Sequence, residues 1–304
     1  MGSTIATDGV ELNGDIPGTP QEVTAVMHAG CYDAPFKELP SYRMRLEELC
    51  RLGFVSVGLA VDWDDLPSDQ SSEDDAATGE LLRANRAELR LHPDLGKLEQ
   101  RARRAGEELL PYARRKLDPL IDWALRHRVL SICCDSIRAD FEATVAVLRL
   151  LIDMTSGTQL RVGVENSQRG IINSADKMNE AVERVDDERM GLLVDVGHIN
   201  TTITNGWIAC DDPAEFLDGL RVPIWDTHIH NNDGRTDSHL TVRDPAGTLD
   251  MVTIVESLHR LGYKGPLNME CAPKEERPSR TALAARLVED REYLEGLISR
   301  VGSV

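Results

Sequence analysis

Short apolar runs alternate along this chain with longer segments in which apolar residues recur at helical spacing. The runs are nearly continuous in aliphatic residues, which is typical of strands buried on both faces of a parallel sheet. Eight strands are predicted, at residues 23–29, 54–61, 87–92, 129–134, 160–165, 191–195, 222–230 and 266–270. Eight β-α units in 304 residues indicate a single (β/α)8 barrel, the TIM barrel fold.

The helices between these runs carry capping signals at their ends. Side chains able to accept a hydrogen bond from the first turn predict helix starts at Asp118 (before Pro119), Asp140, Asp212 and Thr248. Gly262 is predicted to end the helix that Thr248 begins. A last helix is predicted over residues 279–297, and the acidic segment 62–80 is predicted to be a loop or a short helix.

Composition and charge limit the partners of this protein. The 41% hydrophobic content supports a real core, and the net charge of −18 argues against nucleic acid as the main partner. No run of 18 apolar residues predicts a membrane span, and the N-terminus lacks the features of a signal peptide. The six cysteines form no C-x-x-C pair and are predicted to be reduced thiols of a cytoplasmic protein. Residues 1–20 are predicted to be a disordered, solvated tail, and residues 21–300 one catalytic domain.

Chemically versatile side chains follow several of the predicted strands. Residues 224–239 (IWDTHIHNNDGRTDSH) hold three of the eight histidines, and two of them, His228 and His230, are two residues apart and can share a face. Other apolar runs end in Glu165, Asp195 and Glu270. The carboxyl ends of barrel strands meet at one face, so these groups are predicted to converge. Carboxylates and imidazoles together suit a divalent metal ion.

Four motifs resemble the xylose isomerase-like barrel superfamily, which includes sugar isomerases, sugar epimerases and endonuclease IV. They are VGVEN (162–166), LLVDVGH (192–198), HIHNND (228–233) and LNMEC (267–271). The resemblance implies that Glu165, Asp195, His230 and Glu270 bind one divalent metal ion, for which Mn²⁺ is predicted, with Mg²⁺, Co²⁺ or Zn²⁺ as alternatives.

The same resemblance assigns further roles. Glu165 and Glu270 would be the catalytic acid–base pair, and His198 would bind substrate. Arg235 lies near the place of a substrate-binding arginine, one residue closer to the metal-binding histidine than in the family pattern. His228 is predicted to contact substrate or to hydrogen-bond a metal ligand.

A second metal site is a further expectation from the endonuclease branch of this superfamily. Asp237, His239 and His92 resemble metal ligands of that branch. From the residues alone, however, Asp237 and His239 fit a polar loop equally well, and His92 fits a structural role better. The fourth strand ends in Cys133-Cys134-Asp135 where that branch has a histidine, so one metal ion is the simpler prediction.

These residues predict chemistry at a carbon next to a carbonyl group. A metal-bound carbonyl favours proton removal through an enediolate, and a nearby carboxylate can act as the base. The prediction is a metal-dependent isomerase or epimerase of an unphosphorylated sugar or polyol ketone. A lyase or dehydratase on the same scaffold is the main alternative. A phosphodiesterase resembling endonuclease IV and a non-catalytic binding subunit are weaker ones, and a homo-oligomer is compatible with each.

Overall fold

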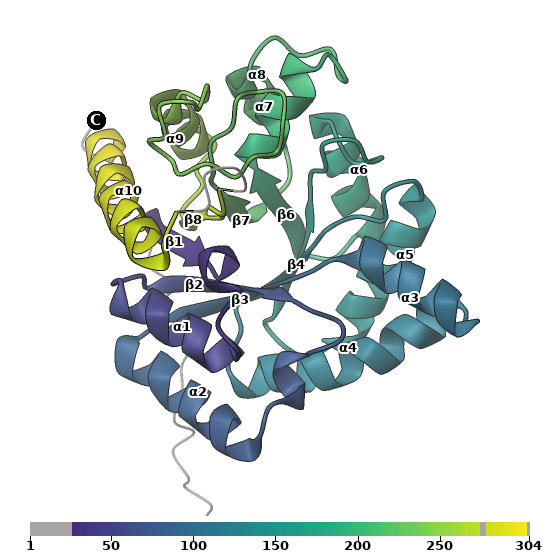
Figure 1. Ribbon diagram of the computed structural model, residues 1–304. Coiled ribbons are helices and arrows are strands. Elements are labelled where there is room, and N and C mark those ends of the chain that lie inside the picture. Colours follow the sequence, from purple (N-terminus) through teal and green to yellow (C-terminus); the bar gives the residue numbers. More distant parts are fainter. Residues whose placement is uncertain (1–25, 274–277, 303–304) are drawn as a thin grey trace, which may run out of the picture.

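Eight parallel strands surrounded by helices form a barrel in the computed structural model, which describes residues 26–273 and 278–302 (Figure 1). The strands are β1 (His28–Tyr32), β2 (Ser56–Val61), β3 (Glu88–Pro93), β4 (Ser131–Cys134), β5 (Arg161–Glu165), β6 (Met190–Asp195), β7 (Ile224–His228) and β8 (Pro266–Met269). Sequential strands pair from β1 to β7, and β8 pairs with β1. A bridge between Ile229 and Met269 joins β7 to β8. This ring confirms the predicted (β/α)8 barrel.

Helices cover the outside of the barrel between successive strands (Figure 1). They are α1 (Tyr42–Arg51), α2 (Ser72–Asn85), α3 (Leu95–Ala105), α4 (Leu109–Arg126), α5 (Phe141–Met154), α6 (Ala175–Val185), α7 (Val196–Thr204), α8 (Pro213–Asp218), α9 (Met251–Arg260) and α10 (Arg280–Val301). Short 3-10 helices occupy Ala34–Phe36 and Pro67–Asp69. No helix in these described ranges is both long enough and apolar enough to cross a membrane.

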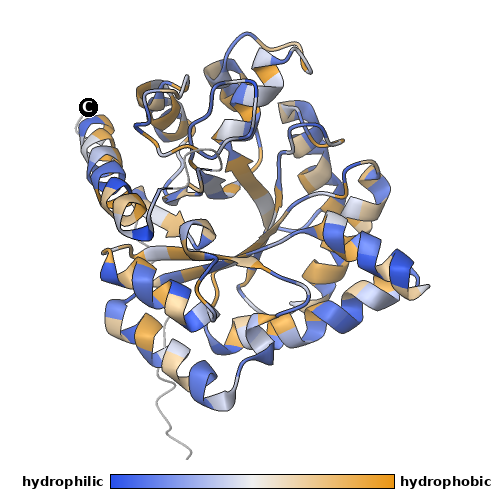
Figure 2. Cartoon of the chain, in the orientation of Figure 1, coloured by the Kyte–Doolittle hydropathy of each residue, from blue (hydrophilic) through white to orange (hydrophobic). Residues whose placement is uncertain are grey.

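The core follows the predicted burial on both strand faces. All residues of β4, β6 and β8 are buried, and Figure 2 shows hydrophobic strands inside helices with mixed surfaces. All six cysteines are free thiols, and only Cys210 is partly exposed. The strand register places Asp195 beside His228, which brings two polar strand ends together at the same end of the barrel.

Several predicted helix ends are confirmed. The Asp140 and Asp212 side chains accept hydrogen bonds from the backbone N–H groups of Ala143 and Glu215, so both residues are N-caps. Gly262 follows the end of α9 with φ of +76°, a left-handed conformation that glycine adopts without a steric penalty.

Two predicted helix starts are wrong. Helix α4 begins at Leu109, so Pro119 lies inside it and Asp118 is not its N-cap. The first half of α4 buries Tyr112, Ala113 and Leu117, and this packing holds the helix together across the proline. Helix α9 begins after Asp250, whose side chain accepts from the Val252 N–H. Thr248 is engaged elsewhere, because its N–H donates to the Asn232 carbonyl oxygen.

The first strand and the acidic segment also differ from the prediction. Strand β1 spans His28–Tyr32 rather than 23–29; residues 23–25 and the predicted tail 1–20 lie outside the described part. Glycine permits this register, because a Cβ at Gly30 would lie 1.8 Å from the Asn268 side-chain oxygen. The segment 62–80 contains the start of α2, a helix of 14 residues whose acidic first turn complements the helix dipole.

Asp290 ties α10 to the loop after β7. Its carboxylate accepts hydrogen bonds from the Val242 N–H at 2.6 Å and the Arg243 N–H at 3.3 Å. Burial raises the pKa of Asp290 from 3.8 to about 6, against the effect of these hydrogen bonds.

This pKa predicts a pH-dependent effect of the Asp290→Asn substitution. A raised pKa means that the folded state binds the Asp290 proton more tightly than the unfolded state does. Protonation of Asp290 therefore stabilises the fold, fully below about pH 4, and this contribution is lost as the pH rises through about 6. Asparagine cannot ionise, so the variant lacks this pH dependence. Between pH 4 and pH 7 the wild type is therefore expected to lose about 2–3 kcal/mol of unfolding free energy relative to Asp290→Asn. Urea unfolding at several pH values measures it. A pH-independent difference would contradict the assignment.

Candidate metal centre

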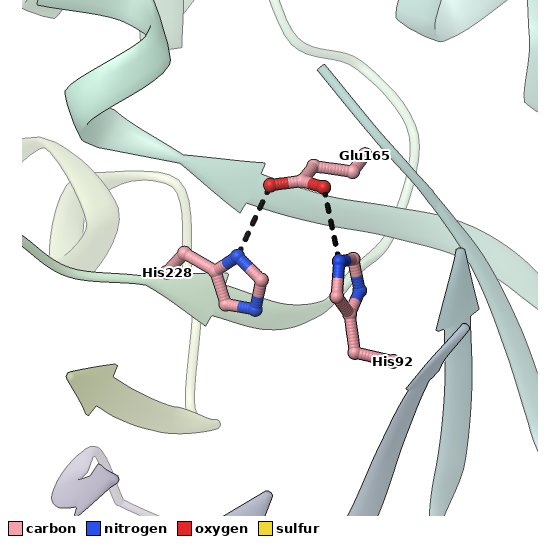
Figure 3. Close-up of side chains that lie close together, drawn as sticks. All are labelled: His92, Glu165 and His228. Carbon is pink, nitrogen blue, oxygen red and sulfur yellow. Dashed lines mark hydrogen bonds and ion pairs between the residues drawn. The ribbon is translucent and has the colours of Figure 1, made fainter. Parts of the chain in front are cut away.

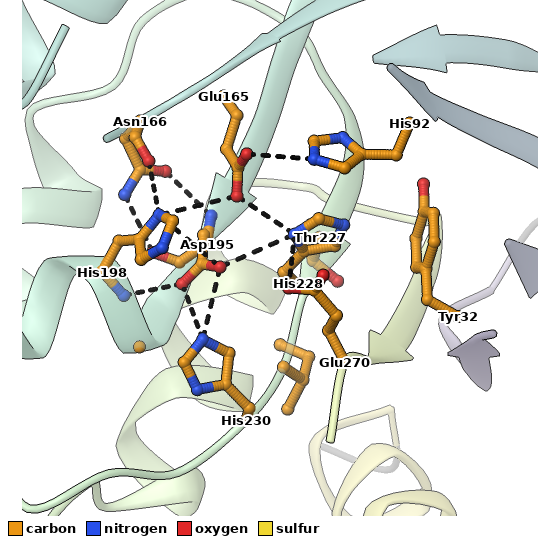
Figure 4. A network of polar contacts seen from close by, with 12 residues as sticks. Tyr32, His92, Glu165, Asn166, Asp195, His198, Thr227, His228, His230 and Glu270 are labelled. Atoms are coloured by element: carbon orange, nitrogen blue, oxygen red, sulfur yellow. Dashed lines mark hydrogen bonds and ion pairs between the residues drawn. The ribbon is translucent and has the colours of Figure 1, made fainter. Parts of the chain in front are cut away.

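Polar side chains that end or follow six strands converge at the carboxyl-terminal end of the barrel. Five are histidines and five are carboxylates. They are His92, Asp135, Glu165, Asp195, His198, His228, His230, Asp237, His239 and Glu270. Each lies at or soon after the end of a strand, where the chain leaves the barrel core. Figure 4 shows part of this cluster, with Glu165, Asp195 and His228 among the labelled side chains. The predicted convergence is therefore present.

Glu165, the last residue of β5, lies between two histidines (Figure 3). Its Oε1 is 3.0 Å from His228 Nδ1, and its Oε2 is 3.4 Å from His92 Nε2. The side chain is only 2% exposed. His228 Nδ1 also lies 3.2 Å from the Glu270 carboxylate. Glu165 and Glu270 thus approach one common point from β5 and from the end of β8.

Asp195 is both a helix cap and a member of the cluster. One carboxylate oxygen accepts from the His198 N–H at 2.6 Å and lies 3.2 Å from His230 Nε2. Asn166 holds this strand end in place, because its amide donates to the Asp195 carbonyl and its side-chain oxygen accepts from the Asp195 N–H. Asp195 can therefore cap the start of α7 and also face the site of a metal ion.

The loop after β7 adds a second group of donors. His239 Nε2 is 2.9 Å from the Asp237 carboxylate, and the rings of His239 and His230 stack with centroids 4.1 Å apart. His230, Asp237 and His239 could together hold a metal ion. So could Glu165 with Asp195 and His198, Asp195 with His230 and Glu270, and His92 with Glu165 and His228.

The histidines are oriented as metal ligands are. His92 donates its Nδ1–H to the Cys133 carbonyl, His198 to the Asn166 carbonyl and His239 to the Glu270 carbonyl, each at 2.8 Å. A carbonyl oxygen can only accept, so Nδ1 carries the proton and Nε2 is the ring nitrogen available to the cluster. Such backbone contacts to the distal nitrogen are usual for metal-binding histidines. His228 differs, because its Nδ1 hydrogen-bonds the Glu165 carboxylate and not a backbone carbonyl oxygen.

The electrostatics of the cluster favour a cation. Burial and the Asp135 carboxylate raise the pKa of Glu165 well above its usual value. Burial opposes the charged form of His92 and of His228, but neighbouring carboxylates outweigh burial and raise the pKa of each to about 9. With pKa values above neutral pH, protonated His92 and His228 offset part of the negative charge of the carboxylates. Divalent cations bind such oxygen and nitrogen donors, so the residues present fit a metal ion.

Comparison with known proteins shows the family of this chain. The family model described as xylose isomerase-like TIM barrel matches residues 51–294. This chain belongs to the xylose isomerase-like TIM barrel family. An uncharacterized protein of Methanocaldococcus jannaschii is 27% identical to it over 131 residues. That match covers 41% of this chain and 41% of the relative.

Solved structures of the same fold cover nearly the whole chain. L-ribulose 3-epimerase has a TM-score of 0.70 at 13% identity, over 91% of this chain and 96% of its own. The IOLI protein with a zinc atom has a TM-score of 0.66 at 16% identity, and the match covers 90% of this chain and 99% of that protein. The third structure is the probable 3-DHS dehydratase AsbF, involved in petrobactin synthesis, from Bacillus anthracis. It has a TM-score of 0.65 at 13% identity, and the match covers 88% of this chain and 99% of that protein. At these identities the likeness shows the xylose isomerase-like fold.

The structure places most of the predicted site residues of this xylose isomerase-like barrel together. The four predicted ligands, Glu165, Asp195, His230 and Glu270, lie in the cluster, and so do His92, His198, His228, Asp237 and His239. Arg235 is on the same loop as Asp237, but its side chain is exposed, and its backbone N–H and carbonyl group make hydrogen bonds to Asp233 and Asn205. Its substrate contact stays a prediction.

Two contributors were missed from the sequence. Asp135 directly follows β4, and its carboxylate is 3.3 Å from His92 Nε2. Tyr32 in β1 packs edge-on against the His228 ring, with centroids 4.6 Å apart, and donates to Asp226 inside the barrel. The signal for Asp135 was its position directly after an apolar run, the same signal that marks Glu165.

Gly197 in α7 is required by the close approach of His230. A Cβ at Gly197 would lie 2.0 Å from the His230 ring, and the His239 ring stacks on the face of that ring. We expect Gly197→Ala to displace His230 and to weaken metal binding by about 10–100-fold. Competitive titration with a metal-chelating dye measures the affinity. Gly296→Ala is the matched control, since its new methyl group meets nothing within 4 Å, and equal affinities for the two variants would contradict the prediction.

Proposed function

We propose that this chain is a divalent-metal-dependent isomerase or epimerase of an unphosphorylated keto sugar or polyol ketone. One observation carries the proposal. Two glutamates from separate strands, Glu165 and Glu270, each place a carboxylate oxygen near the same atom, at 3.0 and 3.2 Å from His228 Nδ1. A substrate carbon held between them would have a carboxylate available on each of two sides. That arrangement suits removal of a proton and its return.

The metal-binding role is proposed for Glu165, Asp195, His230 and Glu270, with Mn²⁺ as the favoured ion. When bound, the ion would polarise the substrate carbonyl group and stabilise negative charge on its oxygen. Asp237, His239 and His92 are proposed ligands of a second ion. These three residues lie in the same cluster as the four proposed ligands, which supports a second ion. Asp135 is a further candidate ligand, because it lies beside His92.

The other residues of the cluster would position the substrate. His198 keeps its Nε2 on the cluster side while its Nδ1–H is held by the Asn166 carbonyl oxygen, so it can donate to or accept from a substrate hydroxyl. His228 is fully buried and fixed by Glu165 and by the edge of Tyr32. Such fixed groups orient a substrate at low entropic cost. Arg235 would reach the substrate from its loop.

A lyase is the second candidate, and the likeness to a dehydratase of the same fold supports it. The same proton removal would be followed by loss of a neighbouring hydroxyl group instead of reprotonation. The proposal expects a small-molecule partner in a cytoplasmic protein, with no nucleic acid or membrane. The net charge of −18 weighs against a phosphodiesterase acting on DNA.

Proton exchange with solvent tests the proposal. The protein, saturated with Mn²⁺, is incubated in deuterated water with a panel of ketoses and keto-polyols, and each substrate is followed by mass spectrometry and, after the ion is removed, by NMR. Deuterium incorporation with a new stereoisomer or aldose is the expected result. Exchange accompanied by loss of water would assign the lyase. Cleavage of abasic duplex DNA without carbon exchange would overturn the proposal in favour of a phosphodiesterase.

A further inference from the structure

A cavity lies at the end of the barrel opposite the candidate metal centre, where the strands begin. Its volume is about 510 Å³, and it is lined by the first residues of β5 and β7 and by the loops that precede β7 and β8. Four cationic side chains border it, with two aromatic rings: Arg90, Arg161, Arg221, Lys264, Trp225 and Tyr263. A concentration of positive charge is unexpected in a chain with a net charge of −18.

Two of the four cations already have acidic partners. The buried Arg90 guanidinium lies 3.1 Å from the Glu88 carboxylate, and its Nε donates to the Ser56 hydroxyl at 3.2 Å. Arg221, at the rim, lies 3.0 Å from the Glu183 carboxylate. These pairs hold the walls of the cavity. They leave Arg161 and Lys264 as the cations whose charge is still available.

Arg161 is half-buried, and among the described residues no carboxylate or carbonyl oxygen accepts a hydrogen bond from its side chain. Its guanidinium instead lies over the Trp225 ring, 4.3 Å from the centroid. Burial and the nearby Arg90 lower the pKa of Arg161, which reflects the cost of packing this charge without an anion. The exposed Lys264 at the rim also has no acceptor in the described part.

Helix dipoles do not account for these positions. The helices end at this side of the barrel, and cations in a last helical turn are stabilised by the dipole. Arg90 and Arg161, however, are in β3 and β5, not in a last helical turn. Trp225 fixes the plane of the Arg161 guanidinium, and a fixed guanidinium can bind a carboxylate or phosphate group through two parallel hydrogen bonds.

We propose that this cavity is a binding site for a small organic anion bearing a carboxylate or phosphate group, with Arg161 as the main contact and Lys264 at the entrance. The site is separate from the candidate metal centre and does not depend on the proposed function. Arg161 and Glu165 are at opposite ends of β5, about 13 Å apart at the rise of a strand.

The Trp225 indole N–H offers a local probe of binding. It donates to the Arg189 carbonyl, and its ring contacts Arg161, so an anion on Arg161 will shift its NMR signal. The chain has four tryptophans, and Trp225→Phe identifies the signal. Inorganic phosphate and succinate are titrated separately at constant ionic strength, which distinguishes a phosphate from a carboxylate site.

Arg161→Met is compared with Arg114→Met, which removes the same charge from the outer surface of α4. We expect a saturable shift with at least one anion, about tenfold or more weaker in Arg161→Met and unchanged in Arg114→Met. If Arg161→Met does not fold, Lys264→Met at the exposed rim replaces it, with a smaller weakening expected. A shift that does not saturate, or equal affinities in the cavity variant and in Arg114→Met, would overturn the site.

Discussion

Replacing Glu165 by glutamine is expected to lower the rate of solvent-proton exchange into substrate by about 10²–10⁴-fold, the usual contribution of a positioned acid or base. The amide keeps the size of the side chain and one oxygen donor, but it cannot take up a proton. Glu270→Gln is expected to show a comparable loss, because Glu270 approaches the same point beside His228. The rates are measured with saturating Mn²⁺ in deuterated water.

The matched control is Glu292→Gln, which makes the same chemical change at an exposed position on α10. It is expected to exchange protons at the wild-type rate. Thermal unfolding of all three variants separates a catalytic loss from a folding defect. A Glu165→Gln protein that is folded, binds metal and keeps wild-type exchange would remove Glu165 from the proposed acid–base pair.

Removing the metal ion is expected to lower the melting temperature by about 5–10 °C. An ion present at about 1,000 times its dissociation constant stabilises the folded state by about 4 kcal/mol, and in a chain of this size each kcal/mol corresponds to about 2 °C. The physical reason is the repulsion between the crowded carboxylates, which the bound ion would offset. The protein is dialysed against a chelator, and its melting curve is recorded before and after Mn²⁺ is restored.

Elemental mass spectrometry of the same samples gives the number of ions per chain. About one ion supports the four-ligand site, and two or more support the additional ligands Asp237, His239 and His92. The double variant Glu165→Gln, Glu270→Gln is expected to bind far less metal and to lose the response of its melting temperature. An unchanged melting curve together with no bound metal in the wild type, after incubation with excess Mn²⁺, would contradict a metal centre.

Local sequence was sufficient for most strands because an aliphatic run followed by an acidic residue marks the end of a buried strand. The runs that end in Glu165 and Asp195 are such cases, and both residues are at the predicted strand ends. The first strand was misplaced because residues 23–29 are as apolar as β1 itself. Its register depends on Asn268, which needs the space beside Gly30. That requirement comes from a strand more than 200 residues away in sequence.

Within the site, the sequence by itself determined which chemical groups follow the strands, and the barrel topology then required that they meet. The family resemblance of the motifs implied Glu165, Asp195, His230 and Glu270 as one set of ligands, which stays a prediction. Only the tertiary structure decided which atoms face the centre. The ring nitrogen that each histidine presents depends on backbone carbonyls of other segments, as with His92 and Cys133.

The tertiary structure likewise decided the role of residues with no local signal. Asp135 became part of the centre because β4 ends beside β3, and Arg161 became an available cation because β7 places Trp225 beneath it. Periodicity and capping act over a few residues, so they are readable in sequence. Charge, burial and hydrogen bonding at these positions depend on contacts between strands far apart in the chain, and only folding brings those contacts into being.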